Sequence, residues 1–421
     1  MIPRLDVYLA AGQPAASEDE LVGRCRFEVQ RGRLSGSFTY DESYLSRPDA
    51  FALDPSLPLR SARHFFTQLP GALRDASPDR WGRHLISRDR TLEAVGAGTP
   101  PRTLDDVDYL LGVHDSTRQG ALRFSEPESP IRLSDKGGVP PLVELKRLVA
   151  ASNAIARGSD GHEHVKELLE AGSGSIGGAR PKAAVLDEGR LLIAKFSHPG
   201  DERDVMAWEK TALDLAKAAG IPAPKASLVR LGTDRALVLE RFDRTSSLVN
   251  GPRIPYLSAM SLLGSSDGEQ RDYVEVAEAM TAFVGDITHE LHSLFRRIAF
   301  SIALHNTDDH LRNLGFLRDK QGWHLSPIFD VNPEPDPNAQ RATGIFGETG
   351  RNEARGLVKA LPAFGLDPGT AQPIVRDVLS AMAQWRQAAR RNGCRDEETR
   401  LFKPVFAEKA QALRAAFGIA G

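Results

Sequence analysis

The chain has 421 residues, of which 41% are hydrophobic and 26% are charged, and its formal net charge is -2 at pH 7. This length exceeds what one hydrophobic core usually organises, so we expect two or three domains. The near-neutral charge argues against a protein that holds nucleic acid by its own basic surface, because such binding needs clustered lysines and arginines.

The two cysteines, Cys25 and Cys394, are too few for a disulfide framework and lack the paired spacing of a zinc site. No run of the sequence approaches the roughly 18 to 20 apolar residues of a membrane span, and the N-terminus does not resemble a signal peptide. We therefore expect a cytoplasmic protein that is neither exported nor inserted into a membrane.

Residues 1–130 predict a small α+β domain. Short alternating segments such as 36–40 are typical of strands, and a helical pattern occupies 81–90. Proline, glycine and charged residues then concentrate between 125 and 141, as in an exposed connector. We place the first domain boundary in this connector.

Residues 140–245 predict a small sheet with a covering helix, and residues 246–421 are mostly helical. The elements expected in the second domain are a helix at 142–156, strands at 183–186, 191–196 and 235–242, and a helix at 204–219. Short strands and prolines interrupt the helical pattern of the third domain between 306 and 337.

A glycine-rich loop precedes the first of these strands. Four glycines lie within the seven residues 172–178. Because glycine has no Cβ, such a loop can bring its backbone N–H groups against phosphate oxygens. It is not a Walker A loop, since the Gly-Lys-Ser/Thr ending is missing and a strand follows. Taken alone, such a glycine cluster is more often a plain flexible turn than a phosphate loop.

Lys195 lies in an apolar strand, so its ammonium group must reach a partner or leave the sheet. In a nucleotide site the partner is a phosphate, and the alternative is an edge-strand lysine that faces water. Glu209, on the helix that follows, is a candidate for the ion pair with which kinases orient this lysine. The alternative for Glu209 is a solvated helix residue.

A polar loop follows a predicted apolar helix at 294–304. Phosphoryl transfer needs a carboxylate near the acceptor hydroxyl and an amide oxygen on magnesium. Asp308 and Asn313 are five residues apart, as in the kinase pattern H-R-D-x-x-x-x-N, whereas Asp309 is only four from Asn313. The spacing predicts Asp308 as the general base. The alternatives are that both aspartates cap a turn and that His310 is a core histidine.

Asp330 follows a predicted short apolar strand and lies 17 residues after Asn313. Mg²⁺ prefers oxygen ligands, few of which come from protein when phosphates and water complete the octahedron. The sequence therefore predicts Asn313 and Asp330 as the protein ligands of Mg²⁺. The alternative is that Asp330 caps whatever follows the strand.

The order of these features is that of a two-lobed kinase: a glycine loop, a strand lysine, an Asp-x-x-x-x-Asn loop and a late aspartate. We expect an α+β, protein-kinase-like fold with a small mixed β-sheet N-lobe, a mostly helical C-lobe and an N-terminal α+β subdomain. We also expect Lys195, Asp308, Asn313 and Asp330 to converge on one magnesium-nucleotide.

Four segments resemble the HipA-like kinases of bacterial toxin-antitoxin modules: SIGGARPK at 175–182, LERFDR at 239–244, NTDDHLRN at 306–313 and PIFDV at 327–331. The segment PDRWGR at 78–83 also resembles that family, so the similarity spans nearly the whole chain. One departure is Asp309, which is not a fixed feature of the family pattern. A second carboxylate there would bind metal or face solvent.

The resemblance implies a role for each matching residue. The residues implied to hold the ATP phosphates are Gly177, Gly178, Ala179, Arg180, Lys182 and Lys195. Those implied to line the adenine are Glu240, Arg241 and Phe242. Asp308 is implied as the general base, His310 and Asn313 as a continuation of the nucleotide site, and Asn313 with Asp330 as the Mg²⁺ ligands.

In HipA proteins a serine of the glycine loop is autophosphorylated, which expels the loop and silences the enzyme. Ser175 matches that serine, and Ser173 is the alternative. A phosphate there would add a charge of about -1.5 to -2 where the ATP phosphates must lie.

The resemblance implies an ATP- and Mg²⁺-dependent serine/threonine protein kinase that phosphorylates a cellular protein, for example one that acts in translation, to arrest growth. A HipB-like, helix-turn-helix antitoxin would restrain it and tether it to operator DNA. One alternative is a small-molecule or lipid phosphotransferase, because other phosphotransferases share the Asp-x-His-x-x-Asn arrangement. Another is a non-catalytic corepressor, against which the intact candidate catalytic residues argue.

Overall fold

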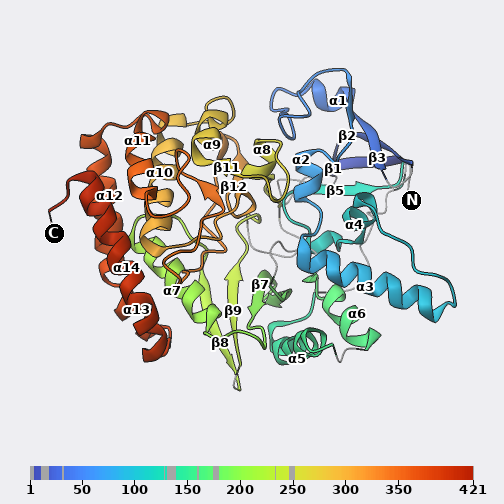
Figure 1. Ribbon diagram of the computed structural model, residues 1–421. Helices are drawn as coiled ribbons and strands as arrows, with labels where there is room; N and C mark the ends of the chain where they lie inside the picture. The colour runs from blue at the N-terminus through green and yellow to red at the C-terminus, as the bar shows by residue number, and fades with distance from the viewer. Residues whose placement is uncertain are drawn as a thin grey trace. The chain divides into compact units, whose positions relative to one another are not determined.

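The computed structural model describes residues 4–10, 19–30, 33–127, 129, 139–158, 161–173, 180–232, 234–245 and 252–420. Within them the fold is α+β, as predicted (Figure 1). The chain forms two compact units, each built from two stretches of sequence. Unit 1 consists of Met1–Gly200 and Arg230–Leu257, and unit 2 of Asp201–Val229 and Ser258–Gly421.

Unit 1 begins with a five-stranded sheet in the order β4-β3-β2-β1-β5. Its strands are β1 (Arg4–Leu9), β2 (Glu20–Gln30), β3 (Arg33–Tyr40), β4 (Arg63–Phe66) and β5 (Leu122–Ser125), paired antiparallel. The alternation along β2 shows why this segment is a strand: Cys25 and Phe27 are buried, whereas Arg24 and Arg26 are exposed.

Helices lie between the strands of this sheet along the chain. They are α1 (Glu42–Leu45), α2 (Gly71–Asp75), α3 (Arg80–Gly96), α4 (Asp106–Gly112) and the 3₁₀-helix η1 (Asp115–Thr117). The helix predicted at 81–90 is confirmed and continues to Gly96.

The second part of unit 1 contains a smaller sheet in which β7 lies between β6 and β9, both antiparallel to it. Its elements are the 3₁₀-helix η2 (Leu142–Glu144), α5 (Leu145–Ala156), α6 (His162–Glu170), β6 (Lys182–Asp187), β7 (Arg190–Phe196) and β9 (Asp234–Glu240). The three predicted strands and the helix predicted at 142–156 are confirmed. In β8 (Ala226–Leu231) the chain passes from unit 2 back into unit 1.

Unit 2 is mostly helical, as predicted for this part of the chain. Its helices are α7 (Val205–Ala218), α8 (Ala259–Leu262), α9 (Tyr273–Met280), α10 (Ile287–Leu304), α11 (Glu353–Lys359), α12 (Pro368–Ala383), α13 (Trp385–Arg391) and α14 (Asp396–Phe417), with the 3₁₀-helices η4 (Leu311–Asn313) and η5 (Leu361–Phe364). Its short strands are β11 (Arg271–Asp272), β12 (Gly315–Asp319), β13 (Gly322–Leu325) and β14 (Thr343–Gly344), and β10 (Tyr256–Ser258) leads into it from unit 1.

Helix α10 is the centre of unit 2. Most of its side chains are buried all round the helix, which is the pattern of a core helix rather than a surface one. Helices α11, α12 and α14 contact it (Figure 1). The Asp286 side chain caps its N-terminus by accepting from the His289 amide at 3.1 Å. The helix therefore provides a rigid base for the loop that follows.

Helix α7 belongs to unit 2, although its sequence lies between strands of the smaller sheet of unit 1. Its Trp208 is buried and lies against Trp385, Phe402 and Phe406 of α13 and α14. The indole nitrogen also donates to Glu398 Oε2 at 2.9 Å. This aromatic cluster is the reason that α7 packs with the C-terminal helices.

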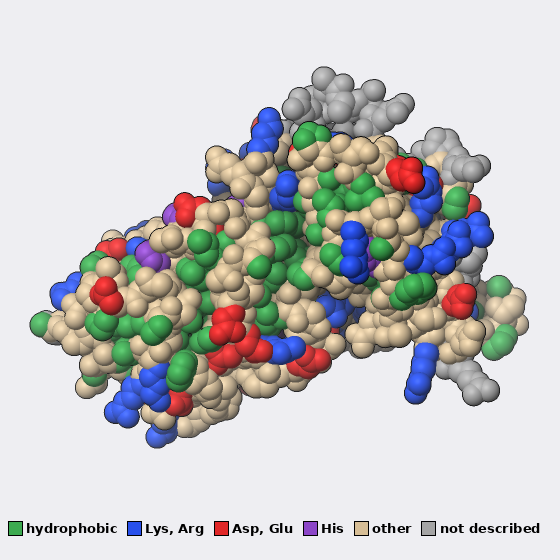
Figure 2. Space-filling view, turned by 90° about the horizontal axis from the view of Figure 1, so that it is seen from above, with side chains coloured by type: hydrophobic (Ala, Val, Ile, Leu, Met, Phe, Trp, Pro, Cys, Tyr) green, Lys and Arg blue, Asp and Glu red, His purple; other side chains and the backbone are tan. Residues whose placement is uncertain are grey.

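Acidic and basic side chains are interspersed on the face of the molecule shown in Figure 2. This distribution agrees with the near-neutral net charge. None of the helices in the described ranges is both long and apolar enough to cross a membrane.

Candidate active site

The segment 305–313, here called the catalytic loop, begins where α10 ends. His305 takes a left-handed conformation with φ 51° and terminates the helix. Its carbonyl accepts from the Glu334 amide at 3.0 Å, and its Nε2 lies 2.8 Å from the Asp336 carbonyl. Burial lowers the pKa of His305, so the imidazole is neutral near pH 7. The first residue of the catalytic loop is therefore held in place by two hydrogen bonds, one to its backbone and one to its side chain.

Asp308 presents its carboxylate to solvent, with 84% of the side chain exposed. Its backbone is held in place, because the Asn313 side-chain amide donates to the Asp308 carbonyl at 3.0 Å. This bond uses the amide nitrogen of Asn313 and leaves its oxygen as the candidate metal ligand. His310 Nε2 lies 3.9 Å from Asp308 Oδ1 and is partly exposed, so it is not a core histidine.

Asp309 occupies the opposite environment, since it is buried. Its Oδ2 accepts from Tyr273 Oη at 2.9 Å, Ser301 Oγ at 2.9 Å and Arg341 Nη1 at 2.5 Å. Burial raises the pKa of Asp309, although Arg341 opposes that shift. The expectation that Asp309 faces solvent is wrong, and the arginine competes with any metal ion for this carboxylate.

A chain of buried charges continues from Asp309 into the helical core. Arg341 Nε lies 2.7 Å from Glu353 Oε2 on α11, and Glu353 Oε1 lies 2.6 Å from Lys409 Nζ on α14. Buried charges of this kind are tolerated only when paired. Arg341, Glu353 and Lys409 were not predicted from the sequence, because each lies among other polar or charged residues and has no local pattern that marks it as buried.

The hairpin β12–β13 connects the two candidate Mg²⁺ ligands. Asn313 lies two residues before β12, and the Ser326 amide, just after β13, donates to the Gly315 carbonyl at 2.8 Å. The hairpin thus returns the chain to the catalytic loop four residues before Asp330. The short strand predicted before Asp330 is β13, which ends at Leu325, because Pro327 has no N–H with which to continue the ladder.

Asp330 takes a left-handed conformation with φ 55°. Such a backbone is uncommon for a residue other than glycine and is concentrated at functional sites. The Ile328 amide donates to the Pro222 carbonyl at 2.8 Å, which fixes the segment ahead of it. Among the described residues there is no group of three or more His, Cys, Asp or Glu that could hold a metal ion. A carboxylate and an amide oxygen nevertheless fit Mg²⁺, which takes its other ligands from phosphates and water.

Two lysines lie opposite each other in unit 1. Lys182 on β6 pairs with Lys195 on β7 in the antiparallel register, so both side chains project from the same face of the sheet. Both are buried. The alternative of an edge-strand lysine facing water is therefore wrong for Lys195. Two ammonium groups on one face of the sheet provide positive charge of the kind that binds phosphate oxygens.

Glu209 is also buried, so the alternative of a solvated helix residue is wrong. Its pairing with Lys195 stays a prediction.

Four residues predicted for the phosphate loop lie outside the described residues: Ser175, Gly177, Gly178 and Ala179. Arg180 is described at the end of this loop. Ser173, at its start, is fully buried, and its hydroxyl donates to the Lys182 carbonyl. A serine held in this way is not accessible for modification, which favours Ser175 over Ser173 as the candidate for autophosphorylation.

The predicted adenine-lining residues lie at the end of β9 and directly after it. Arg241 is buried, and its guanidinium donates to both carboxylate oxygens of Asp243 and to the Thr117 carbonyl at 2.6 Å. Any contact of Arg241 with adenine would therefore come from its backbone. Glu240 Oε1 lies 3.3 Å from Arg190 Nη1, and the Phe242 ring remains partly exposed.

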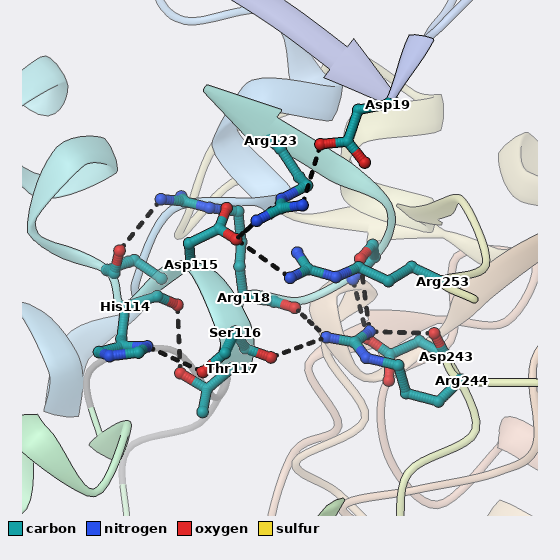
Figure 3. A network of polar contacts seen from close by, with 12 residues as sticks. Asp19, His114, Asp115, Ser116, Thr117, Arg118, Arg123, Asp243, Arg244 and Arg253 are labelled. Atoms are coloured by element: carbon teal, nitrogen blue, oxygen red, sulfur yellow. Dashed lines mark hydrogen bonds and ion pairs between the residues drawn. The ribbon is translucent and has the colours of Figure 1, made fainter. Parts of the chain in front are cut away.

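Arg241 is part of a buried network in unit 1, here called the arginine clamp. Figure 3 shows other members of this network, among them Asp115, Asp243 and Arg244. The clamp joins residues 115–123 to residues 241–253. Its charged members are Asp115, Arg118, Arg123, Arg241, Asp243, Arg244 and Arg253. The arginines take up backbone oxygens as well as carboxylates: Arg244 Nη2 donates to the Arg118 carbonyl at 2.9 Å. The LERFDR motif was recognised in the sequence, whereas no pattern there predicted a role for residues 115–123.

Two family models match the chain. The HipA N-terminal domain matches residues 16–103, and the HipA-like C-terminal domain matches residues 174–386, which is about half of the chain. A candidate kinase of Haemophilus influenzae is 26% identical over 178 residues, which are 39% of this chain and 47% of that protein. The match thus spans about half the length of this curated relative.

Among solved structures, HipA of Shewanella oneidensis MR-1, determined with HipB and its operator DNA, is similar with a TM-score of 0.70 and 18% sequence identity. The similarity covers 98% of this chain and 97% of that chain. The proinflammatory kinase CtkA of Helicobacter pylori is 14% identical over 56% of this chain and 93% of its own, and its TM-score of 0.36 is too low to support an argument about fold. The chain belongs to the HipA family and has the fold of the Shewanella protein.

Proposed function

We propose that this protein is an ATP- and Mg²⁺-dependent serine/threonine protein kinase of the HipA toxin type. The observation that carries the proposal is the contrast between two adjacent aspartates: Asp309 is buried and paired with Arg341, whereas Asp308 is exposed on a loop anchored by that pair. A general base must be held rigidly and still reach the substrate. Asp308 meets both requirements.

Each candidate residue has a part in this proposal. Asp308 orients the acceptor hydroxyl and takes up its proton as the oxygen attacks. Asn313 and Asp330 hold the Mg²⁺ that neutralises phosphate charge, and Lys182 and Lys195 bind phosphate oxygens. When bound, ATP supplies the phosphoryl group that is transferred.

The regulation that we propose follows the family. Phosphorylation of Ser175 would place about -1.5 to -2 charges in the phosphate loop and exclude ATP. The Shewanella HipA was determined in a complex with HipB and its operator DNA. A HipB-like protein would likewise restrain this chain and attach it to DNA, which agrees with the near-neutral net charge of -2, since direct binding of nucleic acid needs clustered lysines and arginines.

Incubation with labelled ATP and Mg²⁺ tests the proposal. We expect label on the chain itself, located at Ser175 by mass spectrometry, and no label after Asp308→Ala or Asp330→Ala. The matched control is Asp319→Ala, which removes an exposed carboxylate at the last residue of β12 and should leave labelling intact.

The remaining outcomes assign other functions. Label that appears only on added small acceptors would indicate a small-molecule or lipid phosphotransferase. Absence of nucleotide binding would indicate a non-catalytic corepressor. Unaltered labelling in both aspartate variants would contradict the assigned site.

A further inference from the structure

The segment 341–347, here called the docking segment, is attached to the catalytic loop on both sides of Asp308. The Ala342 amide donates to the Thr307 carbonyl at 2.8 Å. The Thr343 hydroxyl donates to the Asp309 carbonyl at 2.7 Å, one residue beyond Asp308. The docking segment and the candidate general base therefore form one rigid body.

The far end of the docking segment is a tight turn. Ile345 and Glu348 exchange two backbone hydrogen bonds of 2.9 and 3.1 Å, with Phe346 and Gly347 between them. The Asp272 carboxylate holds this turn by accepting from the Phe346 and Gly347 amides at 3.1 and 2.7 Å. Strand β14 of the segment also pairs with β11, which contains Asp272.

Phenylalanine is an unusual residue for the position that Phe346 occupies in this turn. Phe346 and Gly347 have φ values of 51° and 80°, and turns with two such residues favour Asn, Asp or Gly. For a bulky residue this backbone is a genuine outlier. Burial does not explain the phenylalanine either, because 51% of Phe346 is exposed, whereas the adjacent Ile345 is fully buried.

An exposed aromatic ring on a strained backbone next to a catalytic loop is suited to contact a ligand from outside. We infer that Phe346 binds an apolar side chain of a polypeptide acceptor, close in sequence to the Ser or Thr that Asp308 serves. This inference rests on the proposed kinase function and names the class of its substrate.

The spacing limits how far the apolar side chain lies from the phosphorylated residue. Phe346 is four residues beyond Ala342, so its Cα lies at most about 14 Å from that of Ala342. An extended peptide advances about 3.3 Å per residue. The apolar side chain therefore lies within about four residues of the phosphorylated hydroxyl.

The test uses the full chain and a library of serine peptides in which each of the four positions on either side of the serine is fixed in turn as Leu, Phe, Asn, Asp or Lys. We expect the wild-type protein to favour Leu or Phe at one position. Phe346→Asn suits the left-handed backbone but removes the ring. It should lower kcat/KM for the favoured peptide by about tenfold, mainly through KM, and abolish the preference.

Three controls separate docking from folding. The melting temperature of Phe346→Asn should equal or exceed that of the wild type, since the strain is relieved. Phe346→Leu should restore most of the peptide labelling. Phe65→Ala removes an exposed phenylalanine in unit 1 and should change neither labelling nor the preference.

Unchanged peptide kinetics in Phe346→Asn would overturn the inference. A loss of ATP affinity as large as the loss of peptide labelling would also overturn it, because nucleotide binding needs no peptide. If the variant instead loses self-association while its peptide kinetics stay the same, Phe346 is a contact between two copies and the inference is wrong. A wild-type protein that labels neither itself nor any peptide refutes the proposed function, and the inference falls with it.

Discussion

Asp308 and Asp309 are adjacent in the sequence, but their side chains lie in opposite environments. One carboxylate is exposed, and the other is buried with Tyr273, Ser301 and Arg341 around it. Removing one partner of a buried ion pair leaves an uncompensated charge, which is far more costly than removing an exposed carboxylate. The two residues therefore affect different properties of the protein.

We predict that Asp309→Asn lowers the free energy of unfolding by about 3 to 5 kcal/mol, because Arg341 loses a buried charged partner. Asp308→Asn should leave that free energy within about 0.5 kcal/mol of the wild type and abolish labelling by ATP. Urea unfolding and labelling assays on both variants check this. Equal stability losses in the two variants would contradict the division of roles.

Asp243, in the arginine clamp, predicts a dependence of stability on pH. Burial by itself would raise the pKa of Asp243, but Arg241 and Arg244 outweigh burial and hold the pKa well below its usual value. A carboxyl group with a depressed folded-state pKa contributes stability above its unfolded pKa of about 3.9, and that contribution is lost as the pH falls toward the folded value.

We therefore expect the melting temperature of the wild-type protein to fall steeply below about pH 4. Asp243→Asn should melt at a lower temperature at pH 7 and lose less on further acidification. Thermal melts between pH 7 and pH 3 measure both slopes. Parallel slopes would show that Asp243 does not contribute to acid sensitivity.

At the scale of the element, the pairing of β6 with β7 sets the phosphate chemistry that we propose. The register brings Lys182 and Lys195 together on one face. A one-residue slip would send one lysine to the opposite face, so the position of the charges depends on the ladder rather than on either residue alone.

Lys182→Met and Lys195→Met should each weaken ATP binding by about 10- to 100-fold, the loss expected for one charge-assisted hydrogen bond to phosphate. Calorimetric titration with ATP and Mg²⁺ measures the change. The control is Lys146→Met, which removes an exposed lysine of α5 and should leave the affinity unchanged. Wild-type affinity in both strand variants would disprove a phosphate-binding role for the pair.

Helices and strands with a clear hydrophobic periodicity were predictable from the sequence. The elements against which they pack were not. The apolar strand around Lys195 and the helix beginning at Arg80 follow from local patterns. The association of α7 with the C-terminal helices depends on Trp208 meeting Phe402, nearly two hundred residues away, and no local pattern reports that contact.

The candidate site shows the same limit. Spacing alone selected Asp308 over Asp309, because the distance to Asn313 is a property of the sequence. The burial of Asp309 depends on Arg341, which lies 32 residues further on. The strain at Phe346 depends on a backbone conformation imposed by Asp272, and a phenylalanine in the sequence gives no sign of it.

At the scale of the whole molecule, the proposed function draws on both units. The lysine pair belongs to unit 1, whereas the catalytic loop and Asp330 belong to unit 2. A ligand that binds only the folded protein stabilises it by mass action, by about 2.7 kcal/mol at a concentration one hundred times Kd.

We predict that ATP with Mg²⁺ raises the melting temperature and that chelation of Mg²⁺ by EDTA reverses most of the increase. In Asp330→Asn, ATP should give the same small shift with and without Mg²⁺, because a neutral amide is a poor substitute for the carboxylate. Differential scanning fluorimetry measures these shifts. A shift that is independent of Mg²⁺ in the wild-type protein would contradict the metal assignment.

The arginine clamp limits how freely the two matched parts of the chain can be exchanged. The two family models match separate stretches, 16–103 and 174–386, which suggests two parts that can be exchanged freely. Arg241 and Arg244, however, donate to the carbonyls of Thr117 and Arg118, which neither stretch contains. A chimaera that transplants the C-terminal part alone would leave these two guanidinium groups without their acceptors. Any natural recombination within the family must carry that short intervening peptide along or supply new oxygens for both arginines.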